Sequence, residues 1–595
     1  MSRAFLPLLA ALPVVVSAPA AWAQSAPAAT PATLQASVES SFGHYQPSPS
    51  YEGIQSSSRY VEMRDGVKLA VRIDRPTQGG KVVEGRFPVI WHHTLSISQQ
   101  TADGAGGRVS DFRRVQELVR YGYVVVQVAR RGNGQSTGVR RGYHDRNEAQ
   151  DAFDMTQWLA TQPWSDGKVG VYGCSNTGDA AMHVMTMRPP ALKAVFAGCF
   201  SWNKYDAFRR GGIFAQWGTG PTRTVADDMK VSPVDGDENK VILREAAEEH
   251  QLSTPLFEMW KQLPYRDSWS TLVSSRFWAE GSASSYADQI RLGGVPLYIQ
   301  GGWKDELRDQ GFIAHANIPG SRMVIGPWKH CNSDDFALLE EMHRFYDRHL
   351  KGIDTGIDHD APVHYFTVNA PAGTEWRATA DWPLKQTQMR NFFLDGTKLS
   401  STGGRSKPVS FTADYTVKCA NAGEGSQVQP CHVEGSGASM RGSALSSDTE
   451  VTGNAIADLW ISADKADANV FAYLEDVAPD GTVQVVTEGR LKASLRKEAK
   501  APWALPPGVP WHRAFKEDAQ ALTPGKPVRL RFDMMPTSWV FQKGHRIQIT
   551  LTGSDHRERA RDLAEAPRIT VYFDRDHASS IALPIIPTGS GAGAD

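Results

Sequence analysis

The chain has 595 residues, of which 41% are hydrophobic and 22% are charged, and its formal net charge at pH 7 is −1. A chain of this length is too long for one hydrophobic core, so about two to four domains are expected. This near-zero net charge differs from that of the strongly basic proteins that bind nucleic acid or anionic membranes, so it gives no indication of either partner. We therefore expect no nucleic-acid partner.

The N-terminal residues have the pattern of a cleavable export signal. Arg3 precedes an apolar run, and the small-x-small triplet Ala21–Ala23 stands before Gln24. The apolar run is too short to span a bilayer. We expect residues 1–23 to be a signal peptide cleaved after Ala23, which predicts a periplasmic or secreted protein that is not inserted in the membrane. Residues 24–58 are rich in Ala, Ser and Pro and are expected to form a flexible leader.

Five cysteines gain importance if the chain is exported, because disulfides persist in oxidising compartments. Cys419 and Cys431 lie in a loop-like segment and form the best candidate pair. Cys174 and Cys199 each follow an apolar, strand-like run, so they are expected side by side at neighbouring strand ends, bonded or as thiols. Cys331 is then left over, although five cysteines permit other pairings.

Short apolar runs alternate with helical patterns in residues 59–200. The apolar runs are 87–93, 122–129, 167–173 and 192–198, and the helical patterns are 110–122 and 148–162. This alternation predicts crossover units and a largely parallel sheet. Residues 201–285 are instead rich in helix formers and aromatic residues, which indicates a helical cap inserted into the sheet domain. The strand pattern resumes in residues 286–358, which are expected to complete that domain.

Residues 359–595 lack strong helical patterns. Short, partly alternating runs such as 362–368 and 389–395 are separated by turn signals such as Pro479-Asp480-Gly481. This pattern is typical of a β-sandwich. We therefore predict a separate C-terminal domain that consists of strands.

Two serines compete for the role of nucleophile. Ser136 lies in a literal G-x-S-x-G pattern, whereas Ser175 lies in G-x-S-x-x-G. A nucleophile elbow needs a strand, a tight turn and a helix, because this arrangement lifts the hydroxyl above the sheet edge. The run 167–173 supplies the strand before Ser175 and residues 176–187 supply a helix. A Gly- and Arg-rich segment follows Ser136, so Ser175 is the predicted nucleophile and Ser136 a loop residue.

A serine nucleophile needs a base, and the base needs an orienting acid. Asp305 follows the strand-like run 295–300, and His330 follows the next run, so both would reach the same sheet edge as Ser175. On position alone, Glu306 and Asp309 compete with Asp305. In the same way His343 competes with His330, although it falls within a predicted helix.

Taken together, these features resemble the cocaine esterase-like (CocE/NonD) hydrolases of the X-prolyl dipeptidyl-peptidase (S15) superfamily. The resemblance runs from about residue 55 to 590, and its blocks are QPWSDGKVGVYGCS, PPALKAV, GGWKD, IGPWKH, HLKG, DVAPDGTVQVVTEG and KGHRIQI. It implies an α/β-hydrolase core, a helical cap and a C-terminal all-β jelly-roll (galactose-binding-like) domain. It also implies that Ser175, Asp305 and His330 are nucleophile, orienting acid and general base.

The oxyanion-binding groups depart from the family pattern. The family usually has tyrosine directly after the nucleophile, where this chain has Asn176, but the backbone N–H can still donate to the oxyanion. The family's second donor is typically a tyrosine hydroxyl, and Ser96 stands at the aligned position here. His93 stands where the family has arginine, and either Ser96 or His93 could supply the second donor. Ala129 likewise replaces a family aspartate.

The resemblance also implies a narrow pocket, because cap and jelly roll crowd its mouth in the family. Candidate pocket residues are His92, Trp202, Tyr205, Phe208 and Trp217, although such aromatics could equally pack the cap on the core. No H-E-x-x-H, paired C-x-x-C or P-loop pattern is present, so neither metal nor cofactor is expected.

The sequence thus predicts an exported serine hydrolase that cleaves a small acyl ester or an amide. An α-amino-acid ester hydrolase, an acylase or an X-prolyl dipeptidyl peptidase is the alternative; those acting on a free α-amine need carboxylates that bind the ammonium. A non-catalytic ligand-binding relative is a remote alternative that the missing tyrosine motivates.

Overall fold

The computed structural model describes residues 41–97, 115–214, 223–333, 336–419, 430–432, 435–558 and 563–587. These residues belong to one compact unit. The predicted signal peptide, the leader up to residue 40 and Trp217 lie outside the described residues.

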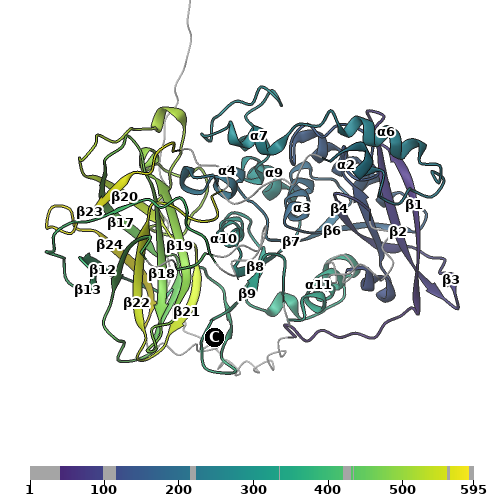
Figure 1. Ribbon diagram of the computed structural model, residues 1–595. Helices are drawn as coiled ribbons and strands as arrows, with labels where there is room; N and C mark the ends of the chain where they lie inside the picture. Colours follow the sequence, from purple (N-terminus) through teal and green to yellow (C-terminus); the bar gives the residue numbers. More distant parts are fainter. Residues whose placement is uncertain are drawn as a thin grey trace, which may run out of the picture. The chain divides into compact units, whose positions relative to one another are not determined.

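The N-terminal region contains an eleven-stranded sheet (Figure 1). Its strands are β1 (Gly53–Glu62), β2 (Lys68–Gln78), β3 (Lys81–Val82), β4 (Phe87–Thr94), β5 (Val124–Ala129), β6 (Ser165–Cys174), β7 (Leu192–Gly198), β8 (Leu297–Lys304), β9 (Arg322–Lys329), β10 (Val363–Phe366) and β11 (Trp376–Thr379). The order is β1-β2-β5-β4-β6-β7-β8-β9-β10-β11, and β3 pairs with β2. Strands from β5 to β10 run parallel, while both edges are antiparallel. The valine-rich runs form the parallel centre, because both of its faces are covered.

Helices cover both faces of this sheet, as the two hydrophobic cores show. The helical segments are η1 (Glu117–Tyr121), α2 (Arg146–Ala160), α3 (Asn176–Met187), α10 (Arg308–Asn317), α11 (Leu338–Tyr346), η4 (Asp347–Lys351) and η5 (Ile357–His359). Side chains of α2, α3 and α10 pack in one core with alternate strand residues such as Val171. The intervening residues such as Tyr172 pack with η1 and α11 in the other. The α/β layer architecture predicted for this part of the chain is confirmed.

Between β7 and β8 the described residues form short helices and loops rather than named strands. The helices are α4 (Lys204–Phe208), η2 (Arg210–Gly212), α5 (Val225–Asp228), α6 (Val241–His250), α7 (Leu256–Lys261), α8 (Phe277–Glu280), η3 (Ala283–Tyr286) and α9 (Ala287–Gly293). Aromatic side chains, including Trp260 and Trp278, hold α4, α7 and α8 together in a separate small core. This segment is the helical insertion that its composition indicated.

The C-terminal region consists of strands that form a second, thirteen-stranded sheet. They are β12 (Gln388–Asp395), β13 (Lys398–Ser400), β14 (Val409–Thr412), β15 (Gly437–Arg441), β16 (Thr449–Gly453), β17 (Ile456–Ala463), β18 (Asn469–Val477), β19 (Val483–Lys492), β20 (Val528–Asp533), β21 (Thr537–Phe541), β22 (Arg546–Thr552), β23 (Arg568–Val571) and β24 (Ser580–Ile586). Two short 3-10 turns, η7 (Ala493–Leu495) and η8 (Lys516–Asp518), interrupt them. The strand pairs are antiparallel except β13–β15.

Two predicted boundaries are wrong. The leader was expected to reach residue 58, but β1 begins at Gly53, and the Phe42 ring stacks on His364 with 3.9 Å between ring centroids. Aromatic residues in this segment bury surface that its Ala- and Pro-rich composition concealed. The strand in 362–368 was expected in the C-terminal domain, but β10 pairs in parallel with β9. A short alternating run does not indicate which of two sheets it joins.

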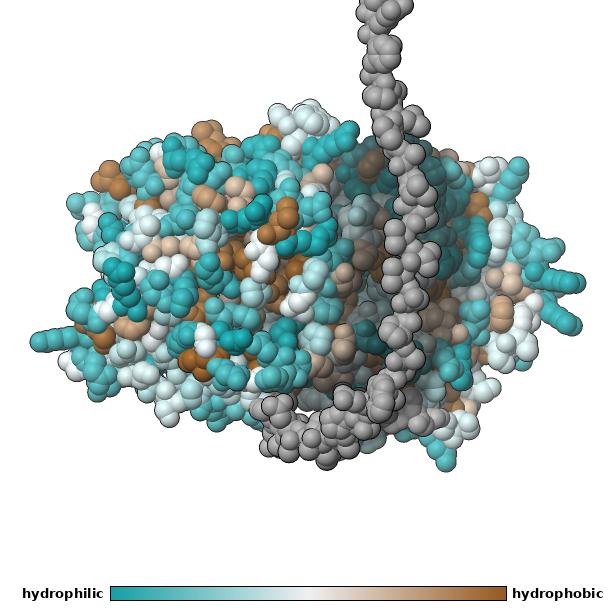
Figure 2. Space-filling view, turned by 180° about the vertical axis from the view of Figure 1, so that it is seen from behind, coloured by the Kyte–Doolittle hydropathy of each residue, from teal (hydrophilic) through white to brown (hydrophobic). Residues whose placement is uncertain are grey.

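Within the described part of the chain, no helix combines the length and apolar character that crossing a bilayer requires. Figure 2 shows a face on which hydrophobic residues are interspersed with hydrophilic ones. Scattered exposed apolar side chains of this kind are normal for folded proteins.

Candidate active site

Ser175 occupies a sharp turn between β6 and α3. Its backbone angles, φ 62° and ψ −126°, lie in a region that non-glycine residues rarely adopt and that costs about 1–3 kcal/mol. Glycines make the turn sterically possible: a Cβ on Gly173 would overlap the Thr177 carbonyl, and one on Gly178 would overlap the Gly198 carbonyl. The unusual G-x-S-x-x-G spacing therefore serves the same strand–turn–helix geometry as the commoner pattern.

His330 connects Ser175 to Asp305. Its Nε2 lies 2.7 Å from Ser175 Oγ, and its Nδ1 lies 3.1 Å from Asp305 Oδ1. Asp305 is 1% exposed, and burial alone would raise the pKa of its carboxyl. The His330 imidazole, the Cys199 side chain and the Leu307 N–H outweigh burial and lower the pKa of Asp305 below its usual value. The carboxylate therefore stays charged, and it can orient the imidazole and stabilise its cation.

The competing acids and the competing histidine lie elsewhere. Asp309 pairs with Arg210, and burial raises the pKa of Glu306 well above its usual value. His343 lies in α11, with its Nε2 3.3 Å from Asp347 Oδ2. Of these candidates, only Asp305 is in contact with a histidine that reaches a serine.

Ser136 has a structural place in the loop that follows β5. Its side chain is fully buried, and its Oγ donates to the Ala129 carbonyl at 2.7 Å and accepts from the Ala70 N–H at 2.8 Å. Both bonds join the loop to the central sheet. Ser136 in the literal G-x-S-x-G pattern is therefore a loop residue, as its sequence context predicted, and its side chain fixes the loop to the sheet.

Asn176 is the first residue of α3, so its N–H has no acceptor within the helix and points toward the helix N-terminus. The rest of this residue is held firmly. Its carbonyl lies 2.6 Å from His144 Nε2, and its side-chain oxygen accepts a hydrogen bond of 2.9 Å from Arg130. The two candidates for the second oxyanion donor differ in position. Ser96 lines the cavity over Ser175, whereas His93 is 2% exposed within β4 and does not line it.

A buried charged cluster lies behind the nucleophile turn. Lys204 is fully buried, and its Nζ lies 2.9 Å from both Asp179 Oδ2 and His144 Nδ1. Because the ammonium donates to Nδ1, His144 carries its proton on Nε2 and donates it to the Asn176 carbonyl. Burial lowers the pKa of Lys204, and the nearby Asp179 carboxylate opposes this shift. Sequence reasoning missed this cluster, because Lys204 stands among other polar and charged residues such as Asn203 and Asp206 and has no local signal of burial.

A cavity of about 1200 Å³ opens over Ser175. Loops that follow β4 and β5 form one side, and α5 and α7 of the helical insertion form the other. Among the predicted pocket residues, Phe208 lines this cavity. Trp202 and Tyr205 are fully buried instead and pack within the hydrophobic cores, and His92 contacts the Tyr172 ring at the end of β4. The expected pocket position of these three residues is wrong: Trp202 and Tyr205 pack the start of the helical insertion, and His92 lies within β4.

Three aspartates line the cavity, and each already has a cationic partner: Asp179 with Lys204, Asp227 with Lys230, and Asp228 with Arg223. Asp228 also contacts the His250 imidazole at 2.9 Å. The exposed Glu258 of α7 adds a fourth carboxylate to the cavity wall, so the cavity does present an acid to a substrate ammonium group.

The C-terminal region holds the loop that carries the acid. Arg308, at the start of α10, donates to the Asp305 carbonyl at 2.9 Å. The same guanidinium donates to Thr487 Oγ1 at 2.9 Å and to the Pro536 carbonyl at 3.0 Å. Both acceptors belong to the C-terminal region, which therefore contacts the acid loop directly.

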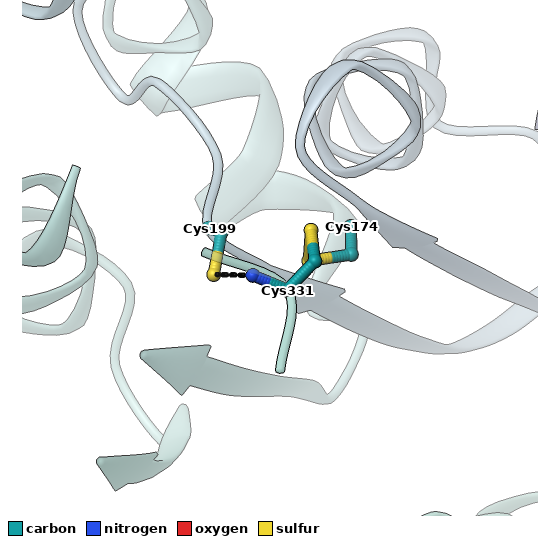
Figure 3. Close-up of side chains that lie close together, drawn as sticks. All are labelled: Cys174, Cys199 and Cys331. Atoms are coloured by element: carbon teal, nitrogen blue, oxygen red, sulfur yellow. Dashed lines mark hydrogen bonds between the residues drawn. A yellow bond between two sulfur atoms is a disulfide. The ribbon is translucent and has the colours of Figure 1, made fainter. Parts of the chain in front are cut away.

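Disulfides join Cys174 to Cys331 and Cys419 to Cys431. The second pair is the expected one, but the expectation that Cys331 is left over is wrong: Cys199 keeps its thiol (Figure 3). The Cys199 sulfur accepts a hydrogen bond of 3.3 Å from the Cys331 N–H. The expectation failed because it considered strand ends alone, whereas the chain after β9 turns back over them.

The parallel sheet, the serine on a strand–turn–helix and the histidine and aspartate at the same edge define the α/β-hydrolase class. Residues 65–332 match the family model for X-Pro dipeptidyl-peptidase (S15 family), and residues 355–568 match that for its C-terminal non-catalytic domain. The chain belongs to this S15 family and is a serine hydrolase.

Sequence relatives support this assignment. A predicted serine esterase of Mycobacterium tuberculosis is 30% identical, with 90% of this chain and 96% of the relative covered. Cocaine esterase of Rhodococcus is 27% identical, with 89% and 98% covered. Solved structures share the fold: a CocE/NonD family hydrolase from Staphylococcus aureus has a TM-score of 0.67 at 19% identity, covering 90% of this chain and 93% of its own. An α-amino acid ester hydrolase has a TM-score of 0.66 at 19% identity, covering 91% and 98%.

Proposed function

We propose that the protein is a carboxylesterase that hydrolyses esters of small acyl groups through a Ser175–His330–Asp305 triad. The observation that carries the proposal is the continuous hydrogen-bonded chain from Ser175 Oγ through His330 to Asp305, at the base of an open cavity. The similarity to serine esterases agrees with it.

In the proposed reaction, His330 takes the proton of Ser175 as Oγ attacks the acyl carbon. Asp305 keeps the proton of the imidazole on Nδ1 and stabilises the cation that forms. The His330 proton then passes to the leaving alcohol, and an acyl-enzyme remains. Water activated by His330 attacks the acyl-enzyme, releases the acid and returns the proton to Ser175.

The tetrahedral intermediate needs donors for its oxyanion. We assign the Asn176 N–H as one donor, since it stands at the N-terminus of α3, where the helix dipole also favours negative charge. We assign the Ser96 hydroxyl as the second. In the structure this hydroxyl donates to Gln135 Oε1 at 3.0 Å, so a rotation about χ1 is part of the proposal. His93 is too deeply buried for this role.

The sequence relatives favour plain acyl esters over substrates that carry a free α-amine. The serine esterase of Mycobacterium tuberculosis and the cocaine esterase are 30% and 27% identical to this chain, whereas a predicted Xaa-Pro dipeptidyl-peptidase of Bacillus cereus is 22% identical. We therefore rank carboxylesterase above amino-acid ester hydrolase and X-prolyl dipeptidyl peptidase. The hydrogen-bonded serine, histidine and aspartate also argue against a relative that only binds ligands.

A fluorophosphonate probe tests the nucleophile without knowledge of the substrate. We expect label on Ser175, lost in Ser175→Ala and His330→Ala and retained in the matched Ser136→Ala control. A panel of p-nitrophenyl acyl esters, aminoacyl esters and X-Pro p-nitroanilides then tests the substrate class. Faster cleavage of the aminoacyl or X-Pro compounds would refute the ranking, and label on Ser136 would refute the triad.

We also propose that the protein acts outside the cytoplasm. The support is the predicted signal peptide together with two disulfides, which persist in oxidising compartments. Fractionation of expressing cells, with N-terminal sequencing of the mature chain, tests this. A periplasmic or secreted protein that starts at Gln24 is expected, and an uncleaved cytoplasmic protein would contradict the proposal.

A further inference from the structure

The Cys174–Cys331 disulfide joins the two residues next to the catalytic pair. Cys174 directly precedes Ser175, and Cys331 directly follows His330. Their Cα atoms are 5.9 Å apart although 157 residues separate them in sequence. The cross-link thus connects the backbone of the nucleophile with the backbone of the base.

Sheet hydrogen bonds do not make this connection. Ser175 follows β6 and His330 follows β9, and β7 and β8 lie between these two strands. The 2.7 Å distance from Ser175 Oγ to His330 Nε2 therefore depends on how the chain after β9 turns back over the strand ends. That turn runs from Lys329 to Asn332, whose N–H donates to the Lys329 carbonyl, and it contains Cys331, whose φ of 52° lies in the left-handed region. Such a backbone persists only where its surroundings hold it.

We propose that this disulfide positions the nucleophile and the base relative to each other, so that its reduction slows ester hydrolysis reversibly. The inference rests on the proposed esterase function. Without the cross-link the turn at Cys331 relaxes, and His330 spends less time within hydrogen-bonding reach of Ser175. A misplacement of about 1 Å can cost about 10²-fold in rate. Cys174 and Cys331 are thus positioning residues rather than catalytic ones.

The reaction at the disulfide is a two-electron reduction. A dithiol such as dithiothreitol attacks the sulfur of Cys331, a partly buried residue, through its thiolate and expels the Cys174 thiolate; it then closes into its own cyclic disulfide and releases the Cys331 thiolate. Two electrons and two protons thereby pass to the protein, which gains two thiols. Oxidised glutathione reverses the change: a protein thiolate forms a mixed disulfide, and the second thiolate displaces glutathione from it.

Cys199 determines how the variants are built. Its sulfur lies within 4.8 Å of both disulfide sulfurs (Figure 3). In a single Cys174 variant, the Cys331 thiol would have Cys199 as a new partner. The test variant is therefore the double variant Cys174→Ser/Cys331→Ser. The matched control is Cys419→Ser/Cys431→Ser, which removes the other disulfide and leaves the Cys174–Cys331 disulfide intact.

The experiment measures kcat, KM and the rate of fluorophosphonate labelling in the oxidised, reduced and reoxidised full-length protein. Reduction is expected to lower kcat about 10- to 100-fold, with KM changed less than about threefold. Oxidised glutathione is expected to restore kcat. The Cys174→Ser/Cys331→Ser variant should have the low kcat and no response to dithiothreitol, whereas the control should respond like the wild type.

The outcomes separate this inference from the proposed function. Oxidised protein with no label on Ser175 and no ester hydrolysis would refute the function, and the inference with it. An active enzyme whose kcat is unchanged, after thiol counting shows Cys174 and Cys331 reduced, would refute the inference alone. If the double variant fails to fold, the wild-type reduction series decides, with circular dichroism showing that the reduced chain is folded. If kcat falls only when the reduced protein also loses its circular dichroism signal, the loss of activity is due to unfolding, and the proposed positioning role of the disulfide is refuted.

Discussion

Lys204 and Asp179 form a buried ion pair whose contribution to stability can be measured by a double-mutant cycle. Lys204 is fully buried, Asp179 is 6% exposed, and their charged atoms are 2.9 Å apart. Removing one partner of such a pair typically costs about 3–5 kcal/mol, because the other charge stays buried without compensation. In Lys204→Met, Asp179 still accepts from the N–H and the hydroxyl of Ser201. We therefore expect about 3 kcal/mol, at the lower end of that range.

The double variant Lys204→Met/Asp179→Asn removes both charges and leaves neither one buried alone. It should cost at least about 2 kcal/mol less than the sum of the two single variants. Urea unfolding followed by tryptophan fluorescence gives the free energies, provided that the m-values agree. Costs that add to within about 0.5 kcal/mol would show that the two charges do not depend on each other, and would refute the reasoning.

Three further predictions concern single residues. Asp305→Asn should lower kcat by about 10⁴-fold with an unchanged fold, because an amide no longer fixes the His330 tautomer; a loss below tenfold in ester hydrolysis would remove Asp305 from the triad. Ser136→Ala should cost about 1–3 kcal/mol in urea unfolding through two lost buried hydrogen bonds, yet keep kcat; loss of labelling with normal stability would contradict this. Burial lowers the pKa of His364 to about 4, so the unfolding free energy should decrease by at most about 3 kcal/mol as the pH is lowered from 6.5 to 4. The reason is that the folded state binds fewer protons than the unfolded chain in this pH range. His364→Phe should reduce the decrease measured by urea unfolding across this range. Equal profiles of unfolding free energy against pH for the variant and the wild type would show that His364 does not contribute.

Local context decided most of what could be predicted. Ser175 was distinguished from Ser136 because a strand before it and a helix after it are visible in the sequence. The same reasoning made Asp305 and His330 candidates, since parallel strands end at one sheet edge, and the family resemblance then distinguished them from Glu306, Asp309 and His343. The alternation of valine-rich runs with helical patterns likewise indicated the layered core.

Contacts between distant segments could not be predicted in this way. Lys204 reaches Asp179 from 25 residues away, and nothing in the residues around it shows that its amine is buried. Cys331 reaches Cys174 over 157 residues through a turn without a sequence signature. An aromatic residue such as Trp202 or Tyr205 has the same sequence signature whether it lines a pocket or packs the insertion against the core. Only the structure shows that these two are buried.

The three hydrogen bonds of Arg308 restrict how this enzyme can be recombined with its relatives. The matched C-terminal model describes a non-catalytic domain, yet here Thr487 and the Pro536 carbonyl hold the guanidinium that supports the Asp305 loop. A chimera that exchanged residues 355–568 would also replace two of the three acceptors of Arg308. Shuffling the two regions as independent modules would therefore disturb the acid loop first, unless the incoming region presented a hydroxyl and a carbonyl at the same places. The unit that can be transplanted is the pair of regions together.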